Sequence, residues 1–87
     1  MADTPTAAQI AAHFSAMDDS VTLINATVAD DTEALSVFGT AAEVKLMITR
    51  NTDHLELQAT HSWYSDSSKS KTPYTGAVTA GKAYVAG

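Results

Sequence analysis

The sequence predicts a mainly α-helical fold: a small helical hairpin or bundle with coiled-coil-like seams and a short C-terminal docking helix. Two observations carry this prediction. Apolar residues recur at steps of three and four along most of the chain, and residues typical of helix caps stand just before the periodic stretches. With 87 residues, the chain is long enough for one domain but not for two.

A first helix is predicted from about residue 4 to residue 29. Thr4 is expected to cap it and Pro5 to occupy its first position, where the missing N–H of proline costs nothing. The apolar residues of this helix form a narrow seam, which suits packing on another helix. That helix could belong to the same small bundle or to a coiled coil between chains, and the spacing does not distinguish these two arrangements. The seam residues follow alternating steps of four and three: Ile10, Phe14, Met17, Val21, Ile24 and Val28.

A second helical region is predicted from about residue 31 to residue 60, with a possible break at Gly39. The run from Asp30 to Glu33 combines a capping-type residue with a carboxylate three places on, which indicates a fresh helix start. Gly39, followed by the pair of Thr40 and Glu43, repeats that signal. Beyond it lies another seam, shifted in phase from the first: Ala41, Val44, Ile48, Asn51 and Leu55.

Residues 44–63 also allow an alternative, an α+β fold with a β-hairpin. Val44, Leu46 and Ile48 alternate along the chain, and Leu55 and Leu57 follow a possible turn in the same alternation. The Ala-rich segment before residue 44 and its capping pair favour the helix.

The C-terminal part is predicted as a Ser-rich hinge at residues 65–71 and a docking helix at residues 72–87. Residues 1–64 then form the main helical region. Thr72 and Pro73 repeat the capping arrangement expected at the first helix. Gly76 and Gly81 weaken the last helix, so it needs to dock in order to form. Its expected anchors share one helical face: Tyr74, Val78 and Tyr84.

Composition and spacing point away from catalysis. The chain has no cysteine and a formal charge of -5, which disfavours thiolate chemistry and binding to nucleic acid or anionic lipid. No segment approaches the length of a membrane span.

The sequence from Gly76 to Lys82 matches a phosphate-loop spacing but lacks the following Ser or Thr and a preceding strand. His54 and His61 would lie about 10 Å apart on a helix, too far to share one ion. We therefore expect no enzyme activity, no cofactor and no metal site.

The charges and one polar patch point to a protein partner. Seven acids and no Lys or Arg precede Lys45, whereas five bases and three acids follow from there. This asymmetry suggests that the two halves face each other, within one chain or between neighbours. Asn51 lies on the second seam, where a buried amide can fix helix register. Arg50, His54 and Leu55 flank it, so this stretch is a candidate interhelical patch.

The stretch R-N-x-x-H-L-E at Arg50–Glu56 and the closing A-G-K-A-Y-V-A at Ala80–Ala86 resemble small uncharacterised bacteriophage proteins. The resemblance implies a structural or accessory protein of a virion, present in many copies and found in the virion or the host cytoplasm. The charge pattern alone is also consistent with a small acidic regulatory or inhibitor-like module that occupies a basic site on another protein.

Overall fold

The computed structural model describes residues 4–87, which form five helices and no strand. Residues 1–3, including Asp3 of the acidic half, lie outside the described residues. The mainly helical fold class is thus confirmed. The β-hairpin alternative is wrong, because residues 44–58 belong to one helix. The helices, in chain order, are α1 (Ala7–Ala29), α2 (Thr32–Phe38), α3 (Ala41–Gln58), α4 (Ser62–Ser65) and α5 (Thr72–Ala86).

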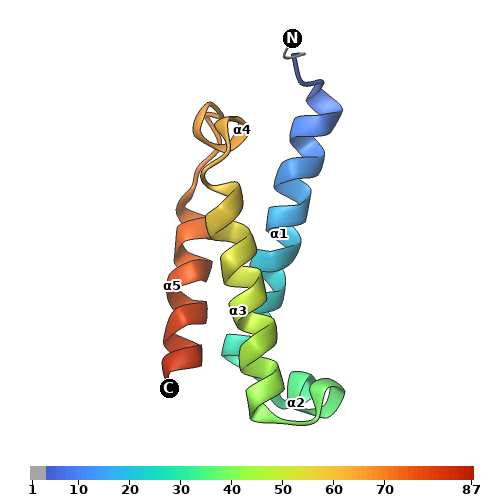
Figure 1. Ribbon diagram of the computed structural model, residues 1–87, viewed down its shortest axis with the longest axis vertical. Coiled ribbons are helices and arrows are strands. Elements are labelled where there is room, and N and C mark those ends of the chain that lie inside the picture. Colours follow the sequence, from blue (N-terminus) through green and yellow to red (C-terminus); the bar gives the residue numbers. More distant parts are fainter. Residues whose placement is uncertain (1–3) are drawn as a thin grey trace.

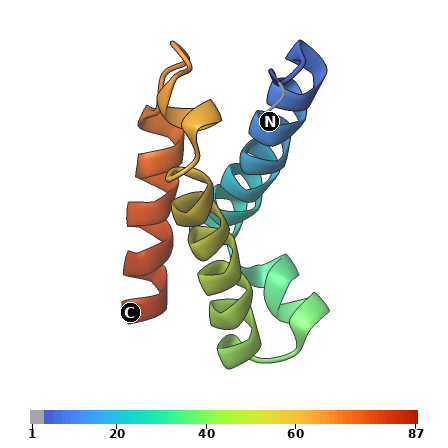
Figure 2. The ribbon, with the colours of Figure 1, turned by 45° about the horizontal axis from the view of Figure 1, so that its top comes forward.

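The three longer helices, α1, α3 and α5, pack against one another along the long axis of the molecule (Figure 1). The short helices α2 and α4 lie at opposite ends of this bundle. The turned view in Figure 2 shows that α1 crosses the α3–α5 pair at an angle, so that its N-terminal half diverges from α5. The molecule is elongated, with extents of 46 × 21 × 19 Å.

The first helix begins two residues later than the sequence predicts. Its N-cap is Thr6, whose hydroxyl oxygen accepts the N–H of Gln9 at 3.1 Å, while the Gln9 side chain accepts the N–H of Thr6 at 2.8 Å. This reciprocal pair needs Glu or Gln three residues after the cap. Thr4 has Ala7 at that position, so it lacks the second half of the arrangement.

The breaks around α2 follow from local signals. The Asp30 carboxylate accepts both the N–H and the hydroxyl of Thr32, at 3.0 and 2.6 Å, and so marks a new helix start. Gly39 ends α2 with a φ of 88°, a conformation that glycine adopts without the steric cost of a side chain. Thr40 then caps α3 by accepting the N–H of Glu43 at 3.2 Å. The possible break at Gly39 is therefore present.

The core lies where the three long helices meet. Each contributes side chains that are almost fully buried, and the burial of this apolar surface is the main source of stability. The buried apolar residues are Phe14, Met17 and Ile24 of α1, Val44, Met47, Ile48 and Leu55 of α3, Tyr64 of α4, and Tyr74 and Ala77 of α5.

Close approach of the helices centres on Gly81 of α5. A Cβ atom at this position would lie 2.5 Å from the Thr52 methyl, 3.2 Å from that of Ile48 and 3.3 Å from that of Ile24. Only a residue without a side chain lets α5 approach α1 and α3 this closely. The second glycine of α5, Gly76, faces open space.

The Ser-rich segment runs from the end of α4 into a loop held by its own lysines. The Lys71 ammonium donates to the backbone carbonyls of Ser67 and Lys69, at 2.7 and 2.8 Å. The Lys69 ammonium lies 4.9 Å from the centre of the Phe14 ring of α1. Helix α5 then begins at Thr72, where the predicted docking helix begins, but its cap position is occupied by Lys71 and not by Thr72.

Candidate functional site

The seam predicted on the first helix is largely used inside the chain. Phe14, Met17 and Ile24 belong to the core, and Ile10 and Val21 pack against it half-buried. Val28, at the end of the seam, is 39% exposed. Most of this seam is therefore not free to pair with another chain.

The residues of the predicted patch around Asn51 lie in different environments and do not form one interhelical contact. The Asn51 amide donates to the carbonyl of Met47 in its own helix at 2.8 Å, so its hydrogen bond goes to its own backbone and to no second helix. His54 does reach α1, through a 2.9 Å hydrogen bond between its Nδ1 and the Ser20 hydroxyl. Leu55 is a core residue, and Arg50 is exposed.

The three expected anchors of the last helix all meet the bundle. Tyr74 is only 2% exposed, and its hydroxyl donates to the Asp18 carboxylate of α1 at 2.6 Å. Burial, together with this bond, raises the pKa of the Tyr74 hydroxyl. The Tyr84 hydroxyl donates to Asp31 at 2.9 Å, and Val78 packs half-buried against the core. Helix α5 is thereby tied to the middle of α1 and to the residue that precedes α2.

One of the ion pairs among residues 4–87 joins the acidic half of the chain to the half that begins at Lys45. Lys69, in the loop before α5, pairs with Asp18 of α1 at 3.5 Å. Lys82 pairs with Glu56 at 3.0 Å within the second half. The Lys45 ammonium donates to the C-terminal residue's backbone oxygen at 2.9 Å. Among residues 4–87, Arg50 is the one cationic side chain without a hydrogen bond or an ion pair to another residue.

An open groove lies between the C-terminal half of α1, helix α2 and the start of α3. Its volume is about 520 Å³. Leu23, Val37 and Phe38 expose apolar surface to it, and Val37 is 71% exposed. Two carboxylates, Asp30 and Glu33, stand on either side of the α1–α2 turn. The lining is Leu23, Ala26, Thr27, Asp30, Glu33, Ala34, Val37, Phe38 and Met47.

Sequence reasoning missed this groove, hereafter the α1–α2 groove. Leu23 and Val37 lie off the predicted seams, where an isolated exposed apolar residue carries no signal. Only the fold of α2 back onto α1 and α3 brings them together. The signal available in the sequence was weak: an apolar pair, Val37–Phe38, directly before the break at Gly39.

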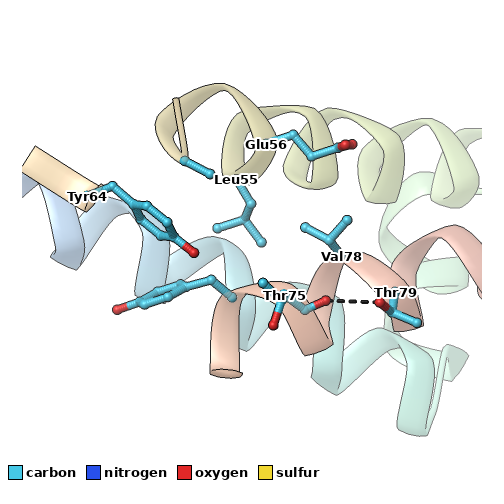
Figure 3. A pocket seen from close by; sticks show the side chains of 8 residues that line it. Leu55, Glu56, Tyr64, Thr75, Val78 and Thr79 are labelled. Carbon is cyan, nitrogen blue, oxygen red and sulfur yellow. Dashed lines mark hydrogen bonds between the residues drawn. The ribbon is translucent and has the colours of Figure 1, made fainter. Parts of the chain in front are cut away.

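A second hollow, of about 290 Å³, lies between α3 and α5 beneath α4 (Figure 3). Several of its polar groups are already engaged. The Thr79 hydroxyl donates to the Thr75 carbonyl at 3.1 Å, drawn as the dashed line, and the Glu56 carboxylate pairs with Lys82. The walls include Leu55, Val78 and the two core tyrosines, of which Tyr74 donates to Asp18. The hollow therefore offers a mainly apolar surface.

Histidines and aromatic rings gather where α1 passes α4. The centre of the His13 ring lies 5.4 Å from that of His61 and 5.9 Å from that of Trp63. Burial, and then the neighbouring His61, lower the pKa of the His13 imidazole. His61 Nδ1 accepts the N–H of Trp63 at 3.1 Å and caps α4. Within the described range, no group of three or more His, Cys, Asp or Glu residues is arranged to hold a metal ion.

The stretch with phosphate-loop spacing, Gly76 to Lys82, lies wholly inside α5. Its Gly81 packs on α3, and Lys82 pairs with Glu56. A phosphate loop needs backbone N–H groups free to point at the ligand, whereas those of a helix interior are used within the helix. None of the helices formed by residues 4–87 has the length and apolar character needed to cross a bilayer.

Comparisons with protein-family models, with curated proteins and with solved structures give no match to this chain.

Proposed function

We propose that this chain is a non-enzymatic protein that docks on a larger protein assembly through the α1–α2 groove. The observation that carries the proposal is Val37. It is 71% exposed and lies in an apolar groove with Leu23 and Phe38, although the rest of the bundle buries its apolar seams. An apolar groove with a polar rim on a small domain is typical of a protein-binding surface.

Docking on a different protein is favoured over self-assembly through the helical seams. Phe14, Met17 and Ile24 are buried within one chain, so they cannot also form the core of a coiled coil between chains. Four of the five Lys and Arg side chains already interact inside the chain, which leaves few cations for the acidic half of a neighbour.

The assembly that we propose is a virion. The support is the resemblance of the Arg50–Glu56 and Ala80–Ala86 stretches to small bacteriophage proteins. A chain with a preformed core and an exposed apolar groove is suited to docking on a protein shell in many copies, because its docking surface is already shaped before binding.

Incorporation into particles tests the proposal. We would purify particles of the virus that encodes the chain and count copies of the chain by quantitative mass spectrometry. We expect many copies with the wild type, and a loss of at least about fivefold when Val37→Gln removes the exposed valine from the groove. Leu57→Gln is the matched control, because Leu57 is 66% exposed and lies outside the groove. Equal incorporation of both variants would refute the groove as the docking surface.

A small acidic regulatory module remains the second candidate. Asp30 and Glu33 at the rim of the groove favour it, since they would attract a basic site on a host protein. Absence of the chain from purified particles, together with a groove-dependent complex in solution, would support this second function over the first.

A further inference from the structure

We propose that the occupant of the α1–α2 groove is an amphipathic helix of the partner protein, with Lys or Arg beside its apolar anchors. This inference rests on the proposed function and adds the chemistry of the partner. Three properties of the groove lead to it: its helical walls, the alanines that line it and its negative charge.

The walls favour a helical occupant over an extended one. They are themselves helices, so their backbone N–H and C=O groups are used within the helices, and no strand edge is offered for β-pairing. An extended peptide would therefore leave its own backbone groups unpaired in an apolar groove. A helix satisfies its own backbone. From Leu23 to Asp30 the α1 wall runs about 10 Å, the length of about two helical turns.

The small residues of the groove also suit a helix. Ala26 on α1 and Ala34 on α2 line it between the larger apolar side chains. Alanine lets a second helix approach closely, and Leu23, Val37 and Phe38 then contact apolar residues spaced three and four apart on the occupant.

The charge of the groove selects a basic occupant. Asp30 and Glu33 line it, and residues 4–44 contain six acids and no Lys or Arg. Two hydrogen bonds from Thr32 lower the pKa of the Asp30 carboxyl, so this group stays ionised well below neutral pH. A Lys or Arg beside the apolar anchors would meet both carboxylates at the α1–α2 turn.

A second copy of the chain fits this groove less well. The exposed ridge on α3 that could enter it, Leu46, Arg50 and Leu57, also carries Asp53, so its two charges cancel and it brings no net positive charge to the acidic rim. Each copy also brings a net charge of -5, so two copies repel at low salt.

A pair of model peptides tests the inference. Each has about 20 residues and is rich in alanine, so that it forms a helix in isolation, with leucines at positions i, i+3, i+4 and i+7. Two positions beside the leucines are lysine in one peptide and glutamate in its counterpart. We expect the lysine peptide to bind in fluorescence anisotropy, and to shift the amide NMR signals of Leu23, Ala34 and Val37. We expect no such binding by the glutamate peptide.

Two matched pairs of variants locate the contact. Val37→Gln should weaken binding of the lysine peptide by about fivefold, which is about 1 kcal/mol, whereas Leu57→Gln should leave it unchanged. Glu33→Gln should weaken binding about two- to threefold at low salt and much less at high salt, because salt screens exposed charges. Glu43→Gln is its control, since Glu43 does not line the groove.

Any of three results with the peptides would overturn the inference: equal binding of both peptides, equal effects of Val37→Gln and Leu57→Gln on that binding, or NMR shifts confined to surfaces outside the groove. Self-association that is lost in both Val37→Gln and Leu57→Gln would also overturn it, because a second copy would then be the occupant. Suppose that Val37→Gln abolishes incorporation into particles but the lysine peptide does not bind. The proposed docking function would then be supported, and the proposal that the partner is a basic helix would be refuted.

Discussion

Replacing Gly81 with alanine tests the close crossing of three helices that forms the core. The added Cβ would lie 2.5 Å from the Thr52 methyl, and 3.2 and 3.3 Å from the methyls of Ile48 and Ile24. Because two of these neighbours are fully buried core residues from different helices, the contact cannot be relieved by one side chain turning into solvent. Overpacking of this kind costs about 1–3 kcal/mol.

A second glycine in the same helix supplies the control. Glycine to alanine in a helix interior stabilises by about 0.5–1 kcal/mol through backbone propensity alone. Gly76→Ala should show this gain, because its Cβ meets nothing within 4 Å. Gly81→Ala carries the same gain and the steric cost together. We therefore expect Gly81→Ala to be less stable than Gly76→Ala by about 1–3 kcal/mol.

Urea unfolding followed by circular dichroism measures both free energies of unfolding. A rescue variant separates the steric cost from other effects. Thr52→Ser removes the methyl nearest to residue 81 but keeps the hydroxyl, which donates to the Thr49 carbonyl at 2.9 Å. In the Thr52→Ser background, Gly81→Ala should lower the free energy of unfolding by less than it does in the wild type. Equal stabilisation by Gly81→Ala and Gly76→Ala would refute the close helix crossing.

Three further predictions concern single contacts. Because the folded pKa of His13 lies below its ordinary value of 6.5, the folded chain should lose stability as the pH falls from about 6.5 through that lower pKa. His13→Asn should flatten this dependence in urea unfolding between about pH 7.5 and about pH 5, and an unchanged slope would contradict it. Tyr74→Phe removes the 2.6 Å bond to Asp18 and should cost about 1–2 kcal/mol of unfolding free energy, whereas a neutral change would show the bond to be unimportant. Thr6→Ala should cost about 1 kcal/mol and Thr4→Ala almost nothing; the reverse order would restore Thr4 as the cap.

The sequence predicted the helix boundary between α2 and α3 correctly, because the residues that set this boundary are neighbours in the chain. Gly39 and Thr40 mark the end of one helix and the start of the next because their effects are steric and local. The cap predicted at Thr4 was wrong, because Thr6 has Gln9 three residues on to complete the reciprocal pair and Thr4 has Ala7 there. Helix α4 was not predicted, since its His61 cap and single turn give no periodic signal.

Periodicity predicted which face of α1 is buried, but not its edges. A straight helix has 3.6 residues per turn, so a strict seven-residue seam drifts off the core face. Val28 has drifted out to 39% exposure, and Thr27 is buried in its place. The Thr27 hydroxyl donates to the Leu23 carbonyl at 2.8 Å, which satisfies its polar atom and leaves its methyl in the core. Thr52 of α3 is buried in the same way.

The α1–α2 groove was beyond sequence reasoning because it exists only after α2 has folded against α1 and α3. Leu23 and Val37 are 14 positions apart, on different helices, and neither belongs to a predicted seam. Their juxtaposition depends on the angle at which the chain leaves Asp30, and periodicity carries no information on that angle.

The central claim is that one chain buries most of its own apolar seams and engages most of its Lys and Arg side chains, which leaves the α1–α2 groove for a different protein. Size exclusion coupled to light scattering, at low and at high salt, tests this most directly. We expect a monomer of 9.1 kDa under both conditions. A defined oligomer that loosens as salt rises would contradict the claim, because the seams and complementary charges would then be shared between chains.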